Sequence, residues 1–196
     1  MLNQATLQLD QLQTLENNKF PTDRSSVLNQ RNTSVSPDLV EEDIEAHQVN
    51  VPRCIRLNFD DLKSFEILHN QFKNWGLIFD NSLVIQPSNP AFPSRSGLKV
   101  LMGSPKNGFL EVNFLRPVNF VSGLVTSSQR LVLSAYNQND ELVNESVLPT
   151  ANVVGSGSDI PPNTLLSVTA NSIKRVNFCC FDGNFTLDEF RFCLTT

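Results

Sequence analysis

The sequence predicts an all-β fold, an antiparallel β-sandwich, from three observations. Residues 109–143 alternate apolar and polar side chains with a period of two, so that Leu110 and Phe114 share one face of a strand while Glu111 and Asn113 share the other. Turn-forming residues recur about every 8–12 positions, which is typical of an antiparallel sheet with one solvated face. Finally, most of the 14 phenylalanines fall inside predicted strands, as the core of a sandwich requires.

The elements follow from the same patterns. Strands are predicted at residues 54–59, 77–79, 83–86 and 97–102, then in two hairpins within 109–143 with turns at 116–117, 127–128 and 137–140, and finally at 165–170, 173–180 and 185–194. One short helix is predicted over residues 62–73, where Leu62, Phe65, Leu68 and Phe72 recur at helical spacing. A total of nine or ten strands with one minor helix is typical of a jelly-roll sandwich.

Two regions with different textures divide the chain. Residues 1–50 are rich in Asn, Gln, Ser and acidic residues, and such a segment cannot bury enough apolar surface to fold alone. We expect it to be a polar N-terminal arm, extended or ordered on a protein partner. Residues 51–196 are expected to form the sandwich domain.

The charge balance and hydropathy exclude two classes of partner. The net charge is −5, from 15 basic and 20 acidic residues, and no basic cluster alternates with aromatic residues, so we expect no nucleic-acid binding. No window approaches the roughly 18 apolar residues of a membrane-spanning helix.

The sequence begins without the basic and apolar regions of a secretory signal and ends without a sorting anchor. This predicts a soluble chain outside the general export route and leaves its compartment undefined.

Catalytic and cysteine chemistry find little support. Neither His47 nor His69 lies beside a recognisable nucleophile, and the GSGSD segment at 155–159 lacks the lysine of a phosphate-binding loop, so we expect no enzyme and no cofactor. The four cysteines allow two interpretations. Either all are small buried thiols of a reducing compartment, or Cys193 forms a disulfide with Cys179 or Cys180 on a neighbouring strand.

Four segments carry a resemblance to a known group of domains. They are LNFDDL at 57–62, GLIF at 76–79, VSGLVTSSQRLVLSAYNQNDELV at 121–143 and FTLDEFRF at 185–192. Together they resemble the jelly-roll domains of bacterial exported proteins, many of which carry a sorting anchor, and they are distantly similar to carbohydrate-binding modules. The resemblance covers roughly residues 53–194 and implies a jelly-roll sandwich.

The resemblance also implies a cation site. In sandwiches of this type the first and last strands lie near each other, and a structural cation can sit between them. Asp60 and Asp61 at the end of the first strand, with Asp188 and Glu189 in the last, are oxygen ligands of the kind that Ca²⁺ prefers. The alternative is that these acids are turn formers and solvated charges.

Two functions are carried forward from the sequence. The first is a non-catalytic binding or structural assembly subunit, in which the sandwich is a platform for protein–protein interaction and residues 1–50 are the tether. The alternative is a carbohydrate-binding module of an extracellular or surface protein. Glycan binding usually uses exposed aromatic rings to stack on sugars, and only Trp75 and Tyr136 could serve here as ligand-stacking residues.

Overall fold

The computed structural model describes residues 53–104 and 108–194, and these fold as the predicted antiparallel β-sandwich. No helix in the described part of the chain is long and apolar enough to cross a membrane. The ten strands and one turn of 3-10 helix are β1 (Cys54–Arg56), β2 (Ile67–Leu68), η1 (Lys73–Trp75), β3 (Leu77–Asp80), β4 (Ser82–Ile85), β5 (Val100–Gly103), β6 (Phe109–Ser127), β7 (Leu131–Tyr136), β8 (Leu142–Leu148), β9 (Thr164–Cys179) and β10 (Phe185–Leu194).

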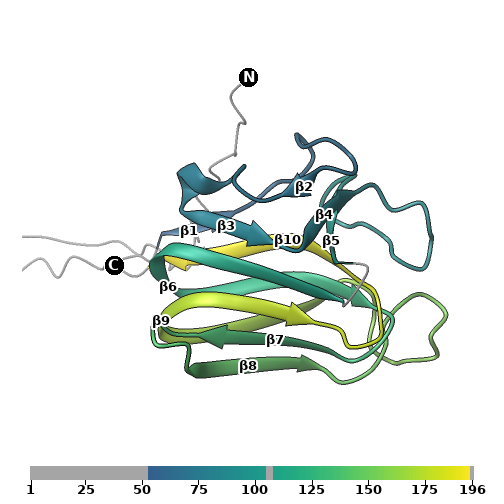
Figure 1. Cartoon of the computed structure of the whole chain (residues 1–196). Helices are drawn as coiled ribbons and strands as arrows, with labels where there is room; N and C mark the ends of the chain where they lie inside the picture. The colour runs from purple at the N-terminus through teal and green to yellow at the C-terminus, as the bar shows by residue number, and fades with distance from the viewer. Residues whose placement is uncertain (1–52, 105–107, 195–196) are drawn as a thin grey trace, which may run out of the picture. The chain divides into compact units, whose positions relative to one another are not determined.

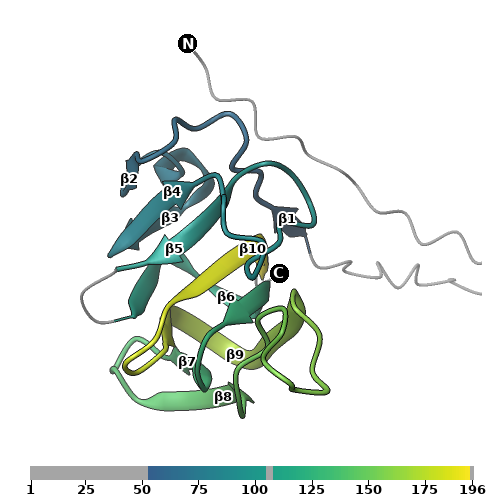
Figure 2. The same cartoon turned by 90° about the vertical axis from the view of Figure 1, so that its right-hand side faces the viewer.

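Hydrogen bonds join the strands into one continuous sheet that bends into two layers. The order is β2-β4-β5-β10-β6-β9-β7-β8, with β1 paired to β10 and β3 paired to β6. One layer contains β3, the first part of β6, the second part of β9, β7 and β8; the other contains the remaining strands and the other parts of β6 and β9. Figures 1 and 2 show β7 and β8 at one edge of this arrangement and β2 and β4 at the opposite edge.

The bend lies inside β6, where the sequence predicted a hairpin turn at 116–117. That prediction is wrong, because β6 continues through Arg116 and Pro117 and pairs with β9 on both sides of them. The register between the two strands shifts between Asn113 and Val118. Proline has no backbone N–H to donate to the ladder, and an irregular pairing of this kind bends a strand without reversing it. The predicted strands 165–170 and 173–180 are likewise one strand, β9, which pairs with β6 on both sides of the same irregularity.

The core lies between the two layers and is rich in phenylalanine. Phe79 of β3 packs against Phe190 of β10 with ring centroids 5.8 Å apart, and Phe178 of β9 stacks on Phe185 at 6.2 Å. The sequence alternation predicts a core that includes Phe114, Val125, Leu133, Phe178 and Phe190, and all five are at most 1% exposed. The predicted core is therefore confirmed.

The predicted helix over 62–73 does not form. This segment consists of turns, the two-residue strand β2 and, at its end, η1. Leu62, Leu68 and Phe72 are buried, but Phe65 is 77% exposed and has a positive φ of 65°, which ends any helical path there. The buried apolar residues of this segment come from successive turns of the chain, and their intervals in the sequence happen to match the spacing of a helix.

A disulfide joins Cys54 of β1 to Cys193 of β10, contrary to both sequence-based interpretations. The two residues face each other directly in the antiparallel pairing of β1 with β10, which brings their side chains together. Cys179 and Cys180 are free thiols, so the expected pairing of Cys193 with either of them is wrong. The first and last strands do lie side by side, as the resemblance implies. Residues 1–50, the predicted arm, lie outside the described residues.

We expect the Phe190→Ala substitution to lower the free energy of unfolding by about 3–5 kcal/mol, because it removes a fully buried ring and leaves a cavity. Urea unfolding followed by fluorescence measures this change. Phe181→Ala is the control, since its side chain is 79% exposed and its loss should cost under about 0.5 kcal/mol. A cost below about 1 kcal/mol for Phe190→Ala would contradict the position of β10 in the core.

Replacing both Cys54 and Cys193 by serine should destabilise the domain by up to about 5 kcal/mol. In the chain-entropy model the cost rises with the loop that the disulfide closes, and these cysteines are 139 residues apart. Cys179→Ser, at a free and half-buried thiol, should change stability far less. Thiol titration of the unfolded, unreduced wild type should count two thiols, and a count of four would contradict the disulfide.

Candidate functional site

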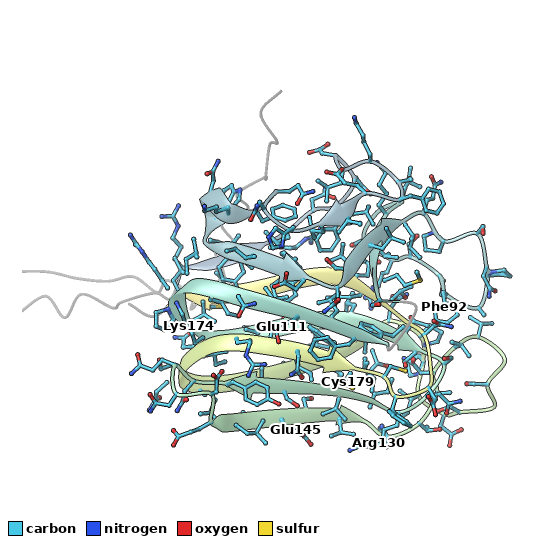
Figure 3. The ribbon with its side chains drawn as sticks, viewed as in Figure 1. Phe92, Glu111, Arg130, Glu145, Lys174 and Cys179 are labelled. Carbon is cyan, nitrogen blue, oxygen red and sulfur yellow. A yellow bond between two sulfur atoms is a disulfide. The ribbon has the colours of Figure 1, made fainter. Side chains whose placement is uncertain are left out.

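Five strands of one layer carry side chains that point away from the core, and we call this surface the outer face; most of these side chains are exposed or half-buried, while Ser134 and Asn177 are buried. Their register aligns the outward-pointing residues in three rows, of which two cross β3, β6, β9, β7 and β8 and the third crosses β6, β9, β7 and β8. The central row is Ile78, Asn113, Arg175, Tyr136 and Leu142; the polar row is Asp80, Glu111, Asn177, Ser134 and Glu145; the apolar row is Phe109, Cys179, Val132 and Val147. Figure 3 labels Glu111, Cys179 and Glu145 on three of these strands.

Arg175 is the centre of this face. Its Nη1 donates to Glu111 Oε2 at 3.0 Å, and its Nη2 donates to Asp140 Oδ1 at 3.1 Å. The guanidinium carbon lies 4.1 Å from the centroid of the Tyr136 ring, a cation–π contact. Burial alone would lower the pKa of Arg175, but hydrogen bonds and charges from Asp140 and Glu111 outweigh it and raise that pKa above its usual value. The guanidinium is therefore a permanent, oriented donor.

A second set of polar contacts extends the network toward β3. Asn113 Nδ2 donates to Glu111 Oε1 at 3.1 Å and to Asp80 Oδ2 at 3.3 Å. His69 Nδ1 donates to the carbonyl of Phe79 at 2.8 Å and lies 3.2 Å from Asp80 Oδ1. Side chains from four strands and two loops thus hold each other in position across the outer face.

The two aromatic residues named from the sequence lie in different places. Tyr136 belongs to the central row of the outer face, where Arg175 covers one side of its ring. Trp75 is the last residue of η1 and lines a cleft of about 430 Å³. The structure does not bring the two rings into one site, and their roles in stacking stay predictions.

The four acids proposed as calcium ligands are also dispersed. Asp60 Oδ1 accepts hydrogen bonds from the backbone N–H groups of Leu98 and Lys99, both at 2.9 Å. Gly97 has no Cβ, and one placed there would meet the Asp60 carboxylate, so a larger residue would force this carboxylate to move. Asp61 is exposed in a turn.

Asp188 is 1% exposed and holds the same loop from β10. It accepts from the N–H groups of Arg95, at 2.7 Å, and Ser96, at 3.2 Å, and from the Ser96 hydroxyl. Glu189 instead pairs with Arg56 at 3.7 Å. Within residues 53–104 and 108–194, no group of three or more His, Cys, Asp or Glu side chains is placed to hold a metal ion. The calcium site stays a prediction.

Sequence reasoning missed the residues at the centre of the outer face. Glu111 and Asn113 carry a signal, since the alternation places both on the solvated face of their strand. Arg175 and Asp80 carry none, because only the pairing of β6 with β9 and β3 brings them beside Glu111 and Asn113. Cys180 directly follows the last residue of β9 and is fully buried; this burial raises the pKa of its thiol, with partial compensation from Ser127.

Comparison with known proteins gives distant structural similarity only. No protein-family model and no curated protein sequence matches the chain. Among solved structures, the chain is similar to CpGH89CBM32-6 of Clostridium perfringens, at 13% identity and a TM-score of 0.30, covering 58% of this chain and 93% of that one.

Two further solved structures match smaller parts of longer chains. The CBM22-1–GH10 modules of Clostridium thermocellum endo-1,4-β-D-xylanase 10B, complexed with xylohexaose, match at 12% identity and a TM-score of 0.32, over 66% of this chain and 27% of that one. The enzymatically active domain of bacteriophage CBA120 tailspike protein 4 matches at 10% identity and 0.33, over 67% and 21%. Similarity at this level assigns no ligand to this chain.

Asp188→Asn should lower the free energy of unfolding by at least about 2 kcal/mol, because three donors face this buried carboxylate and hydrogen bonds to a charged acceptor are the strong ones. Asp159→Asn, in an exposed loop, is the matched control.

Melting curves in EDTA and in millimolar Ca²⁺ test the calcium prediction on the same proteins. Calcium bound at Asp188 should raise the wild-type midpoint and not that of the variant, whereas identical wild-type midpoints would contradict a calcium site.

Proposed function

We propose that this domain binds a neutral oligosaccharide across the outer face, as a non-catalytic carbohydrate-binding module. The observation that carries the proposal is a network of hydrogen bonds beside the ring of Tyr136. The network joins Asp80, Asn113, Glu111, Arg175 and Asp140. The proposed site therefore lies mainly on strands, and Asp140 is contributed by the loop between β7 and β8.

The chemistry of these side chains suits sugar hydroxyls. Each hydroxyl both donates and accepts a hydrogen bond. The network offers carboxylate acceptors, guanidinium donors and an amide that both donates and accepts. Arg175 covers one side of the Tyr136 ring, so a pyranose would have to stack on the opposite side, next to Leu142 of the central row. The apolar row, which includes Phe109 and Val132, provides a dry border for the less polar faces of the sugar.

The mutual contacts keep the cost of binding low. Long side chains lose rotational freedom when they grip a ligand, at about 0.5–1.5 kcal/mol each. Arg175, Glu111 and Asn113 are already ordered by one another, so much of that cost is met during folding. The face carries the carboxylates of Asp80, Glu111, Asp140 and Glu145 against the single guanidinium of Arg175, which disfavours polyanionic ligands and favours neutral ones.

The test is a glycan array followed by titration calorimetry with the neutral oligosaccharide that binds best. Tyr136→Ala and Glu111→Gln should each weaken binding by about tenfold or more, since each removes a stacking surface or a charged acceptor. Tyr136→Phe retains the ring and should lose less. Arg130→Gln, an exposed cation at the turn before β7 labelled in Figure 3, is the control and should bind as the wild type does.

Two results would contradict the proposal. One is that the folded protein binds no neutral glycan on the array. The other is wild-type affinity in both Tyr136→Ala and Glu111→Gln. The expected role of residues 1–50 in binding a protein partner stays a prediction, because the arm lies outside the described residues.

A further inference from the structure

The cleft that contains Trp75 lies at one end of the sandwich and has a composition unlike the outer face. Its volume of about 430 Å³ is within the usual range of small-molecule sites, roughly 300–1,000 Å³. Buried apolar side chains form its floor and polar or charged ones its rim. Phe114 and Phe192 belong to the floor, and Arg53, Lys73, Asn74 and Arg116 belong to the rim.

The backbone holds Trp75 in place. The turn η1 ends at Gly76, whose φ of 86° is a left-handed conformation that favours glycine. The Gly76 N–H donates to the carbonyl of Lys73 at 2.9 Å, and the Gly76 carbonyl accepts from the N–H of Leu115 on β6 at 2.8 Å. The Trp75 side chain is half-buried and packs against the core. The turn that carries Trp75 is therefore held in place beside the cleft, and its indole packs partly against the core.

The rim of the cleft is positively charged on an acidic chain. Arg53, Lys73 and Arg116 all line it, and no acidic side chain of the described residues does. In the described part of the chain, none of these three cations takes part in an ion pair. Lys174, labelled at the same end in Figure 3, donates to the carbonyl of Leu115, one of the lining residues. With a net charge of −5 over the whole sequence, this concentration of cations is local.

We propose that the Trp75 cleft is a second binding site, and that its ligand is an acidic sugar, a pyranose that bears a carboxylate. The ring would stack on the Trp75 indole above the apolar floor, the Asn74 amide would bind hydroxyl groups, and the carboxylate would bind the cations of the rim. This site is separate from the outer face. None of the residues proposed to bind a ligand in the cleft is also proposed to bind one on the outer face.

The composition favours an acidic sugar over other anions. A nucleic acid needs a long basic surface along its backbone, whereas these cations surround one cleft of limited volume. An acidic peptide would use the charges but has no need of an indole beside an apolar floor. A uronic acid uses both features, because it combines a carboxylate with the apolar face of a sugar ring.

The experiment compares trigalacturonate with its methyl ester by titration calorimetry. The ester keeps the rings and removes the charge, so the acid should bind at least about tenfold more tightly, the difference expected for one charge-assisted contact. Trp75→Ala should weaken trigalacturonate binding by about tenfold or more, and Lys73→Gln and Arg116→Gln by about threefold to tenfold each. Arg130→Gln is the control for loss of a cation outside the cleft and should have no effect.

Three results would overturn the proposal. They are equal affinity for the acid and the ester, equal loss in Arg130→Gln and Arg116→Gln, and tighter binding of a hexaglutamate peptide than of trigalacturonate. Glu111→Gln, on the outer face, should leave trigalacturonate binding unchanged, and Trp75→Ala should leave neutral-glycan binding unchanged. Failure of one site is thereby distinguished from failure of the other, and melting midpoints confirm that each variant is folded.

Discussion

The antiparallel pairing of β6 with β9 is the constraint on which the rest of the domain depends. The two longest strands run beside each other from Phe109 and Cys179 at one end to Val125 and Thr164 at the other. Because both belong to both layers, the bend near Pro117 places the two halves of the sheet face to face. The phenylalanine core fills the space between them. A straight β6 would leave the apolar sides of both layers exposed.

The same pairing builds the outer face. Side chains in a strand alternate, so the register between β6 and β9, together with the registers of β3, β7 and β8 on either side, sets which residues share a row. Glu111, Asn113 and Arg175 come together for this reason, and the contacts among them hold long side chains in one arrangement. A shift of one residue would send these charged groups into the core, where the free energy of burying them would strongly destabilise the sheet.

The remaining parts are attached to this framework by specific contacts. The disulfide fastens β1 to β10 at the end of the domain where the Trp75 cleft lies, and Arg53 of the cleft precedes Cys54. Asp60 and Asp188 hold the loop that leads into β5 by accepting hydrogen bonds from its backbone. Carboxylates that suggested a cation in the sequence thus act as acceptors for N–H groups that no strand satisfies. The disulfide contradicts the interpretation in which all four cysteines are thiols, and Cys179 and Cys180 remain free.

The sequence by itself determined the fold class, the core and the two sides of each strand. Alternation is a local property, and burial of one face follows from it wherever the sheet forms. The alternation within strands, the core phenylalanines and the solvent-facing side of Glu111 and Asn113 were predictable for that reason, whereas the continuity of β6 and β9 and the presence of β2 were not. Tertiary structure decided the bend at Pro117, the pairing of Cys54 with Cys193, the use of Asp188 as a loop anchor and the meeting of Arg175 with Glu111. Each of these joins residues far apart in the chain, and their partners are chosen by how strands pair in space, which period-two texture alone does not encode.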